Sequence, residues 1–237
     1  MKPGTLYGIG VGPGDPELLT LKGLRLLRSV PLVYVPVARP GARSYAREIA
    51  AEHLDLNRQQ VVELVFAMRE EPAVMQGHWK ANAALIANDL REGRDAAFLT
   101  EGDPMIFSTW VHVAGALHET LPEAPVVVVP GISSPQAAAA VAGVTLADRD
   151  ERLAILPATY EREDLLEVLR SFDTVVLLKV ASVMDPVLDA LDALDLSARA
   201  VYIARCGRPD QEVVCDVREL RGRSLPYFSL LIIRRNG

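Results

Sequence analysis

The chain of 237 residues has few of the side chains that hold metals or form disulfides. It contains two cysteines, Cys206 and Cys215, and four histidines. Because the cysteines do not form a Cys-x-x-Cys pair and no histidine cluster accompanies them, a zinc site is not expected. We predict no protein-bound metal, and no disulfide in what we take to be a cytoplasmic protein.

Long apolar runs and basic tracts are also missing. No stretch approaches the roughly 20 apolar residues of a membrane-spanning helix, and the first residues do not resemble a secretion signal. The formal net charge is -6, and no basic tract is present that could neutralise a nucleic-acid backbone. We therefore expect a cytoplasmic protein that binds neither nucleic acids nor membranes.

Apolar residues make up 50% of the chain, and they are arranged in short strands that alternate with helices. In the first half, strands are predicted at 31–36, 61–65 and 95–100, after a first strand that opens the chain. This alternation is typical of an α/β layer whose strands run parallel.

Two helices of the first half have clear sequence signals. One is predicted at 72–90, with apolar residues at spacings near four. The other is predicted to begin at Pro16, with Asp15 as its N-cap. Its apolar face is expected to consist of the leucines Leu18, Leu21, Leu24, Leu26 and Leu27.

Two prolines and an acidic residue between 121 and 125 indicate a hinge, so we predict domains at 1–120 and 121–237. The second domain is expected to open with a buried strand of four valines at 126–129. The last two strands, 212–216 and 227–233, are predicted to close on each other. The predicted fold class is therefore two-domain α/β, with a mostly parallel first sheet and a mixed second sheet.

Flexible or polar loops follow several of the predicted strands. In open α/β sheets, ligands bind at the carboxyl ends of the strands, so we expect these loops to line one cleft between the two domains. Each loop alone is also explained as a turn or a helix cap. Because Pro104 keeps Asp103 extended, its carboxylate is expected to point outward. The loops lie at 10–15, 101–108, 131–134, 179–182 and 205–209.

The glycines of the first loop do not form a nucleotide-binding fingerprint. In a Gly-x-Gly-x-x-Gly pattern the third glycine would fall on Pro13 or Asp15, and the ribose-binding acid expected about 20 residues on is missing. A nicotinamide-dependent oxidoreductase is therefore not favoured, whereas a non-catalytic nucleotide-binding domain stays open. The sequence does not contain serine, histidine and aspartate in the order of a known catalytic triad. This favours a reaction in which a cofactor supplies the difficult step.

Three motifs, taken in order, resemble those of the tetrapyrrole methylases, and the resemblance covers essentially the whole chain. The chain is most similar to the branch of precorrin-2 C-20 methyltransferases, because Glu101 precedes Gly102 and because of its segments 15–22, 178–180 and 226–230. The three motifs are Gly8-Ile-Gly-Val-Gly-Pro-Gly-Asp15, Glu101-Gly-Asp-Pro104 with Ile106 and Phe107, and Pro130-Gly-Ile-Ser-Ser134.

The resemblance implies an enzyme, usually a homodimer, that transfers a methyl group from S-adenosylmethionine to a tetrapyrrole and releases S-adenosylhomocysteine. Gly10 and Gly12 would face the tetrapyrrole. At the position of Lys179, relatives often have a methionine. The implied cofactor-binding residues come from both domains and are Pro13, Glu101, Gly102, Asp103, Ile106, Phe107, Ser133, Ser134, Lys179 and Cys206.

A substrate with many carboxylates calls for arginines near the cleft. By location, Arg39 and Arg43 are the first candidates for substrate binding, and Arg205 and Arg208 are further ones. In the implied reaction, the meso carbon C-20 attacks the sulfonium methyl group, but the residues identify no general base. Metal-free and cobalt-loaded precorrin-2 both stay open as substrates. So do uroporphyrinogen III, another precorrin carbon and the protein substrate diphthine.

Overall fold

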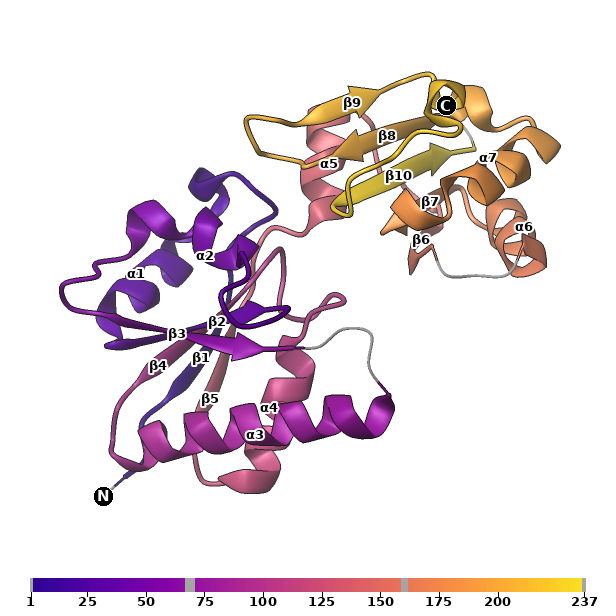
Figure 1. The fold of residues 1–237 in the computed structure, drawn as a ribbon. Coiled ribbons are helices and arrows are strands. Elements are labelled where there is room, and N and C mark those ends of the chain that lie inside the picture. Colours follow the sequence, from indigo (N-terminus) through magenta and orange to yellow (C-terminus); the bar gives the residue numbers. More distant parts are fainter. Residues whose placement is uncertain (1, 67–70, 159–161, 236–237) are drawn as a thin grey trace. The chain divides into compact units, whose positions relative to one another are not determined.

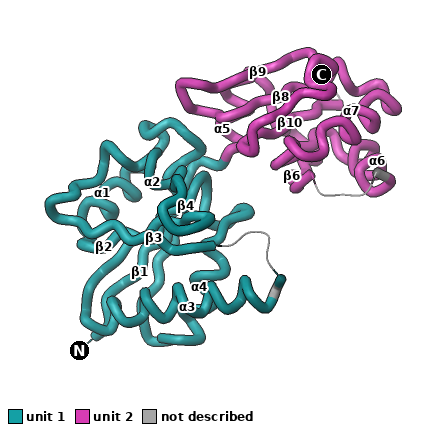
Figure 2. Tube along the Cα trace, in the orientation of Figure 1, with its two compact units in different colours: residues 1–133 teal, residues 134–237 magenta. Residues whose placement is uncertain are grey.

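The structure, a computed structural model, describes residues 2–66, 71–158 and 162–235. The chain divides into two compact units, 1–133 and 134–237 (Figure 2). Among the described residues, no helix is both long and apolar enough to cross a membrane. No three histidine, cysteine or acidic side chains in these ranges gather as a metal site would require.

The first unit is a parallel sheet with helices on both faces (Figure 1). All five strands run parallel, in the order β3-β2-β4-β1-β5, so the predicted parallel α/β layer is confirmed. The strands are β1 (Leu6–Gly10), β2 (Leu32–Val37), β3 (Gln60–Val65), β4 (Ala96–Thr100) and β5 (Val126–Val129). The helices described in this unit are α1 (Leu21–Ser29), α2 (Tyr45–Ile49), α3 (Pro72–Arg91) and α4 (Trp110–Thr120).

The helices divide the core of this unit into two layers. Ile86 of α3 and Val113 of α4 are buried against one face of the sheet, and Leu27 of α1 and Ile49 of α2 are buried against the other. The neighbouring strands β1 and β4 therefore continue into helices on opposite faces. Such a point, at the carboxyl edge of a parallel sheet, is where α/β proteins bind ligands.

The two units meet in sequence between Ser133 and Ser134, whereas the predicted boundary lies at 120. The difference arises because β5 pairs in parallel with β1, so it completes the first sheet instead of opening the second. It is an edge strand, and Val126 and Val128 are 39% and 37% exposed. The prediction of a strand at the four valines is confirmed, but the prediction that this strand is buried was wrong.

The first helix begins later than predicted. Asp15 does cap a turn, since its Oδ1 accepts a hydrogen bond from the Glu17 N–H (2.8 Å), but this turn is a 3₁₀ helix of three residues. The helix α1 starts anew at Leu21, with Thr20 as its N-cap. Because the break shifts the helical phase, Leu21 is 86% exposed instead of part of the apolar face.

The second unit has a mixed sheet, as predicted, and its strand order is β6-β7-β10-β8-β9. The prediction that the last two strands close on each other was wrong, because β8 lies between β9 and β10 and pairs with both. Its central strand β10 is antiparallel to both β7 and β8, while β6 and β7 are parallel. Helices α6 and α7 share its main core, through Leu169 and Leu188 among others. The strands are β6 (Leu153–Pro157), β7 (Thr174–Leu178), β8 (Ala200–Ala204), β9 (Glu212–Val214) and β10 (Ser229–Arg234). The helices are α5 (Ser134–Ala142), α6 (Arg162–Ser171) and α7 (Met184–Ala193).

Gly8 in β1 lies against the ring of Trp110, the first residue of α4. A Cβ at Gly8 would lie 2.5 Å from two ring carbons. We expect Gly8→Ala to lower the free energy of unfolding by about 2 kcal/mol, because the buried ring must shift. Gly115→Ala is the control, since Gly115 is an exposed position of α4 with no atom within 4 Å of its would-be Cβ.

In Gly115→Ala the free energy of unfolding is expected to rise by about 0.5–1 kcal/mol, because alanine favours the helix. Urea unfolding followed by circular dichroism measures both variants. Equal effects of the two substitutions would contradict the assignment of the Gly8–Trp110 contact.

Candidate functional site

Three loops meet at the carboxyl edge of the first sheet, after the adjacent strands β4, β1 and β5. The Gly102 N–H donates a hydrogen bond to the Gly12 carbonyl (2.8 Å), and the Gly12 N–H points back to the Gly102 carbonyl (3.4 Å). This isolated antiparallel bridge joins the loop after β1 to the loop after β4. Two of the loops predicted to form the site are therefore in contact within this unit.

The carbonyl oxygen of Gly102 explains two glycines of the neighbouring loops. A Cβ at Gly10 would lie 2.5 Å from this oxygen, and a Cβ at Gly131 would lie 2.2 Å from it. Gly102 itself has a φ of 63°, in the left-handed region that glycine adopts readily. Gly10 thus has a packing role, and its contact with a substrate stays a prediction.

Asp103 ties the loop after β4 to the loop after β5. Its Oδ1 accepts a hydrogen bond from the Met105 N–H (2.8 Å), and its Oδ2 accepts one from the Gly131 N–H (3.0 Å). The carboxylate expected to point outward is therefore turned toward the protein backbone. A sequence cannot reveal this, because the partner Gly131 comes from a different loop.

A pair of hydroxyl groups fixes both ends of the loop 101–107. The Oγ1 of Thr100, the buried last residue of β4, lies 2.7 Å from the Oγ of Ser108. The same Ser108 Oγ accepts a hydrogen bond (3.1 Å) from the N–H of Trp110, the first residue of α4, whose N-cap is Thr109. The loop is thus held together at its two ends by Thr100 and Ser108. It is also held at Gly102 and Asp103, through their hydrogen bonds to the neighbouring loops.

This fixed loop leaves apolar side chains in solvent. Met105 is 63% exposed and Phe107 is 52% exposed, and Ile132 of the loop after β5 is 37% exposed. Phe107 also has a φ of 49°, which costs a residue other than glycine on the order of 1 kcal/mol. Two loops at the carboxyl edge therefore expose apolar side chains that a ligand could cover.

Arginines follow β2 at the same edge of the sheet. Arg43 forms an ion pair with Glu48, and its guanidinium lies 5.2 Å from the centre of the Tyr45 ring. Arg39 is exposed, and its side chain makes no hydrogen bond or ion pair within the described part of the chain. Of the two predicted substrate-binding arginines, Arg39 is therefore the one available to an external carboxylate.

In the second unit, two predicted residues come to one edge of the mixed sheet. Lys179 follows β7, Arg205 and Cys206 follow β8, and the start of β10 lies between them. The Lys179 N–H donates to the Ser229 carbonyl (3.0 Å), and the Arg205 N–H donates to the Phe228 carbonyl (2.8 Å). Lys179 and Arg205 both have a left-handed backbone conformation, with φ of 60° and 50°.

Burial and charge set the chemistry of the loop after β8. Burial raises the pKa of the Cys206 thiol to about 11, so it is a neutral group at physiological pH. Arg205 and Arg208 both face Asp210, at 3.0 and 3.2 Å. Desolvation raises the pKa of Asp210, but the Arg208 hydrogen bond and the two positive charges outweigh it and lower that pKa. These arginines are therefore already partnered.

The structure brings the predicted residues together in two groups, one in each unit. The first group lies on the loops after β1, β2, β4 and β5, and the second lies on the loops after β7 and β8. Ser134 begins α5, which packs against β8 and β10. Sequence reasoning missed the roles of Thr100, Phe228 and Ser229. Of these, only Thr100 had a sequence pattern that could have indicated its role, because it is a hydroxyl residue at a strand end and a serine follows just before the next helix.

Comparison with known proteins identifies relatives over nearly the full length. A family model described as Tetrapyrrole (Corrin/Porphyrin) Methylases matches residues 5–221. The cobalt-precorrin-2 C(20)-methyltransferase of Salmonella typhimurium is 30% identical, over 98% of this chain and 97% of that protein. The precorrin-2 C(20)-methyltransferase of a Sinorhizobium species is 31% identical, over 97% and 95%.

A solved structure is similar in fold over a comparable length. It is the uroporphyrin-III C-methyl transferase from Thermus thermophilus, complexed with S-adenyl homocysteine. The TM-score is 0.69 and the identity 25%, and the alignment covers 98% of this chain and 97% of that chain.

The double hydrogen bond to Asp103 predicts an effect of Asp103→Asn on stability. Asparagine has one carbonyl oxygen, so either the Met105 or the Gly131 N–H loses its acceptor. We expect the free energy of unfolding to fall by about 1–2 kcal/mol. Asp15→Asn is the matched control, because Asp15 accepts from the Glu17 N–H with one oxygen and asparagine caps equally well. Urea unfolding without ligand measures the free energy of unfolding of both variants. Equal losses in the two would contradict the role of the two Asp103 hydrogen bonds.

Proposed function

Because the chain belongs to the tetrapyrrole methylase family, we propose that it methylates C-20 of precorrin-2, metal-free or cobalt-loaded, in cobalamin biosynthesis. Membership makes it an S-adenosylmethionine-dependent methyltransferase. Two relatives that match over nearly their whole length support the finer assignment by their names, one with cobalt and one without. The structural observation that carries the proposal is the fixed loop 101–107, which exposes Met105 and Phe107 at the switch point of the first sheet.

The residues of this loop fit an adenosyl cofactor. Gly102 has no side chain and a left-handed backbone, so no Cβ keeps a ligand away from its Cα. Phe107 offers an exposed ring, and Ile106 and Pro13 are half-buried apolar neighbours in the motifs. We propose that these residues, with Glu101 and the backbone of Asp103, hold the cofactor. Lys179, Cys206, Ser133 and Ser134 are the further cofactor contacts that we propose.

When bound, S-adenosylmethionine would supply a methyl group on a sulfonium sulfur, which is a good leaving group. The protein then has to align the two partners and exclude water. The hydrogen bonds of Thr100, Gly102 and Asp103 fix the loop before any ligand binds. Because both oxygens of Asp103 already accept backbone hydrogen bonds, we do not assign it the removal of the C-20 proton.

A second candidate substrate is uroporphyrinogen III. It is favoured by the likeness to the Thermus thermophilus uroporphyrin-III enzyme, whose alignment covers 98% of this chain. The two readings share the cofactor and differ only in the macrocycle that is methylated.

The test is a mass spectrum of the tetrapyrrole after incubation with the protein and S-adenosylmethionine. Precorrin-2, its cobalt-loaded form and uroporphyrinogen III are supplied in parallel. We expect a gain of one methyl group on one of the precorrin-2 forms, and NMR with a methyl-labelled cofactor to find the label at C-20. Methylation of uroporphyrinogen III alone would replace the proposal by the second candidate. Binding of the cofactor without any methylation would contradict both.

Arg39→Ala tests the substrate side of the proposal. Because Arg39 has no partner in the described chain, we expect its loss to raise the KM for the tetrapyrrole about fivefold, as for one exposed ion pair. Arg43→Ala should raise it about twofold at most, since Arg43 already pairs with Glu48. The KM for S-adenosylmethionine should stay unchanged in both.

Arg91→Ala is the control, because Arg91 lies at the end of α3, away from the carboxyl edge, and bonds the Thr120 carbonyl. Steady-state kinetics with each substrate varied in turn measures all three variants. If Arg39→Ala behaves like Arg91→Ala, Arg39 does not bind the substrate.

A further inference from the structure

An exposed segment leads into the central strand of the second sheet. It comprises residues 221–228, called the strap below, and it joins the 3₁₀ helix η5 (Val217–Leu220) to β10. Its first residues, Arg221 to Ser224, are exposed. The carbonyls of Phe228 and of the adjacent Ser229 accept the hydrogen bonds of the two left-handed turns at Arg205 and Lys179. The strap therefore leads directly to the two carbonyls that these turns use, Phe228 at its end and Ser229 at the start of β10.

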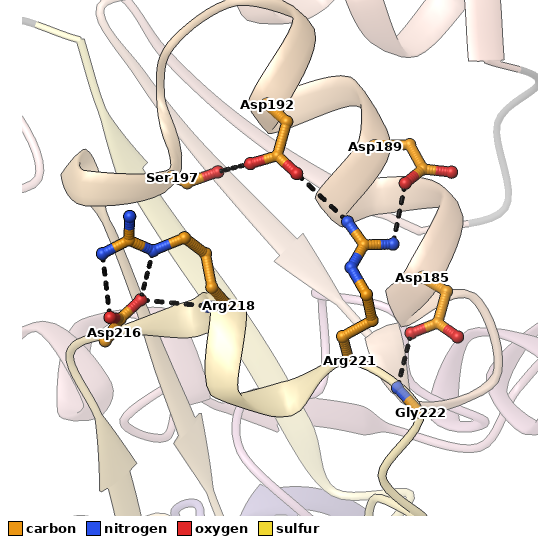
Figure 3. Close-up of polar contacts among 8 residues, drawn as sticks. All are labelled: Asp185, Asp189, Asp192, Ser197, Asp216, Arg218, Arg221 and Gly222. Carbon is orange, nitrogen blue, oxygen red and sulfur yellow. Dashed lines mark hydrogen bonds and ion pairs between the residues drawn. The ribbon is translucent and has the colours of Figure 1, made fainter.

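Charged side chains tie the beginning of the strap to α7. The guanidinium of Arg221 donates to Asp189 Oδ1 (2.8 Å) and to Asp192 Oδ2 (3.1 Å) (Figure 3). The next residue, Gly222, donates its N–H to Asp185 Oδ1 (3.0 Å). Asp192 is itself held by the Ser197 hydroxyl (2.5 Å). The strap thus has three hydrogen bonds to one helix face before it reaches β10.

This helix face needs a positive charge opposite it. Asp185, Asp189 and Asp192 are spaced by four and three residues, so their like charges lie near one another. Asp189 and Asp192 also lie toward the carboxyl end of α7, where the helix dipole disfavours negative charge. Arg221 offsets both effects, and the hydrogen bond to Asp189 raises the pKa of Arg221 above its ordinary value.

Arg218 provides a contrast within the same few residues. It lies in η5, and its guanidinium donates to both oxygens of Asp216, at 2.7 and 2.8 Å (Figure 3). Asp216 is two residues earlier in the chain, so this pair is local. The charge of Arg218 also acts on Asp192 of α7, but its hydrogen bonds go to Asp216. Arg218 and Arg221 are both exposed and both paired, and they differ in what their partners connect.

We propose that Arg221 is a positioning residue for cofactor binding. By tying the strap to α7, it holds the Phe228 and Ser229 carbonyls in the place where they receive the Arg205 and Lys179 N–H groups. The proposal rests on the proposed function in one respect, namely that Lys179 and Cys206 contact S-adenosylmethionine. No residue of the strap tie itself touches the reacting atoms in this proposal.

Hydrogen exchange in the cofactor-free, full-length protein tests the positioning step. We expect Arg221→Ala to speed exchange of the Lys179 and Arg205 amides about fivefold, the size expected for one exposed charge network. Arg218→Ala should leave both rates unchanged. Arg221→Lys should recover part of the protection, because a lysine can reach one of the two carboxylates. Unchanged exchange in Arg221→Ala would overturn the proposal.

Titration calorimetry with S-adenosylhomocysteine tests the link to the cofactor. Arg221→Ala is expected to weaken binding about three- to fivefold, with Arg221→Lys between it and the wild type. In turnover assays the KM for S-adenosylmethionine should rise while kcat stays within about twofold. Faster exchange with unchanged affinity would overturn the link. A wild-type protein that binds no S-adenosylhomocysteine would refute the proposed function. The exchange rates would still test whether the contact of Arg221 with α7 positions the two turns.

Discussion

The approach of three backbone segments to the carbonyl oxygen of Gly102 is the contact on which the first unit depends. Gly10 and Gly131 reach this oxygen from either side, and neither leaves space for a Cβ. The contact fixes the relative positions of the ends of β1, β4 and β5, which carry the motifs of the family. Any side chain at Gly10 or Gly131 would separate these ends and remove the bridge between Gly12 and Gly102.

The same contact explains why the loop 101–107 can hold unfavourable features. Exposed apolar side chains at Met105 and Phe107, and a left-handed backbone at Phe107, would each favour rearrangement in a free loop. The hydrogen bond between the Thr100 and Ser108 hydroxyls, and the one that Asp103 accepts from the Gly131 N–H, remove that freedom. Because the loop is ordered before a ligand arrives, binding does not have to supply the entropy cost of ordering it.

Local patterns predicted most elements, since alternation and helical periodicity are properties of neighbouring residues. Local patterns were insufficient where a residue distant in the sequence determines the pairing of a strand or the direction of a side chain. The valines of β5 read alike in a buried or an edge strand, and only the pairing with β1 assigns them to the first sheet. The Asp103 carboxylate turns inward because it accepts a hydrogen bond from the Gly131 N–H, 28 residues later. The exposure of Leu21 follows from a break at Leu19 and Thr20 that shifts the helix by a few residues.

The two units hold their loops by different physical means. In the first unit the restraints are steric contacts and backbone hydrogen bonds around glycines, which salt does not screen. In the second unit, Arg205 and Lys179 donate to the carbonyls at the end of the strap and at the start of β10. Exposed charges of Arg221, Asp189 and Asp192 tie the beginning of the strap to α7. Interactions between exposed charges weaken as ionic strength rises. We therefore expect the loops after β7 and β8 to respond to ionic strength more strongly than the Gly102 contact does.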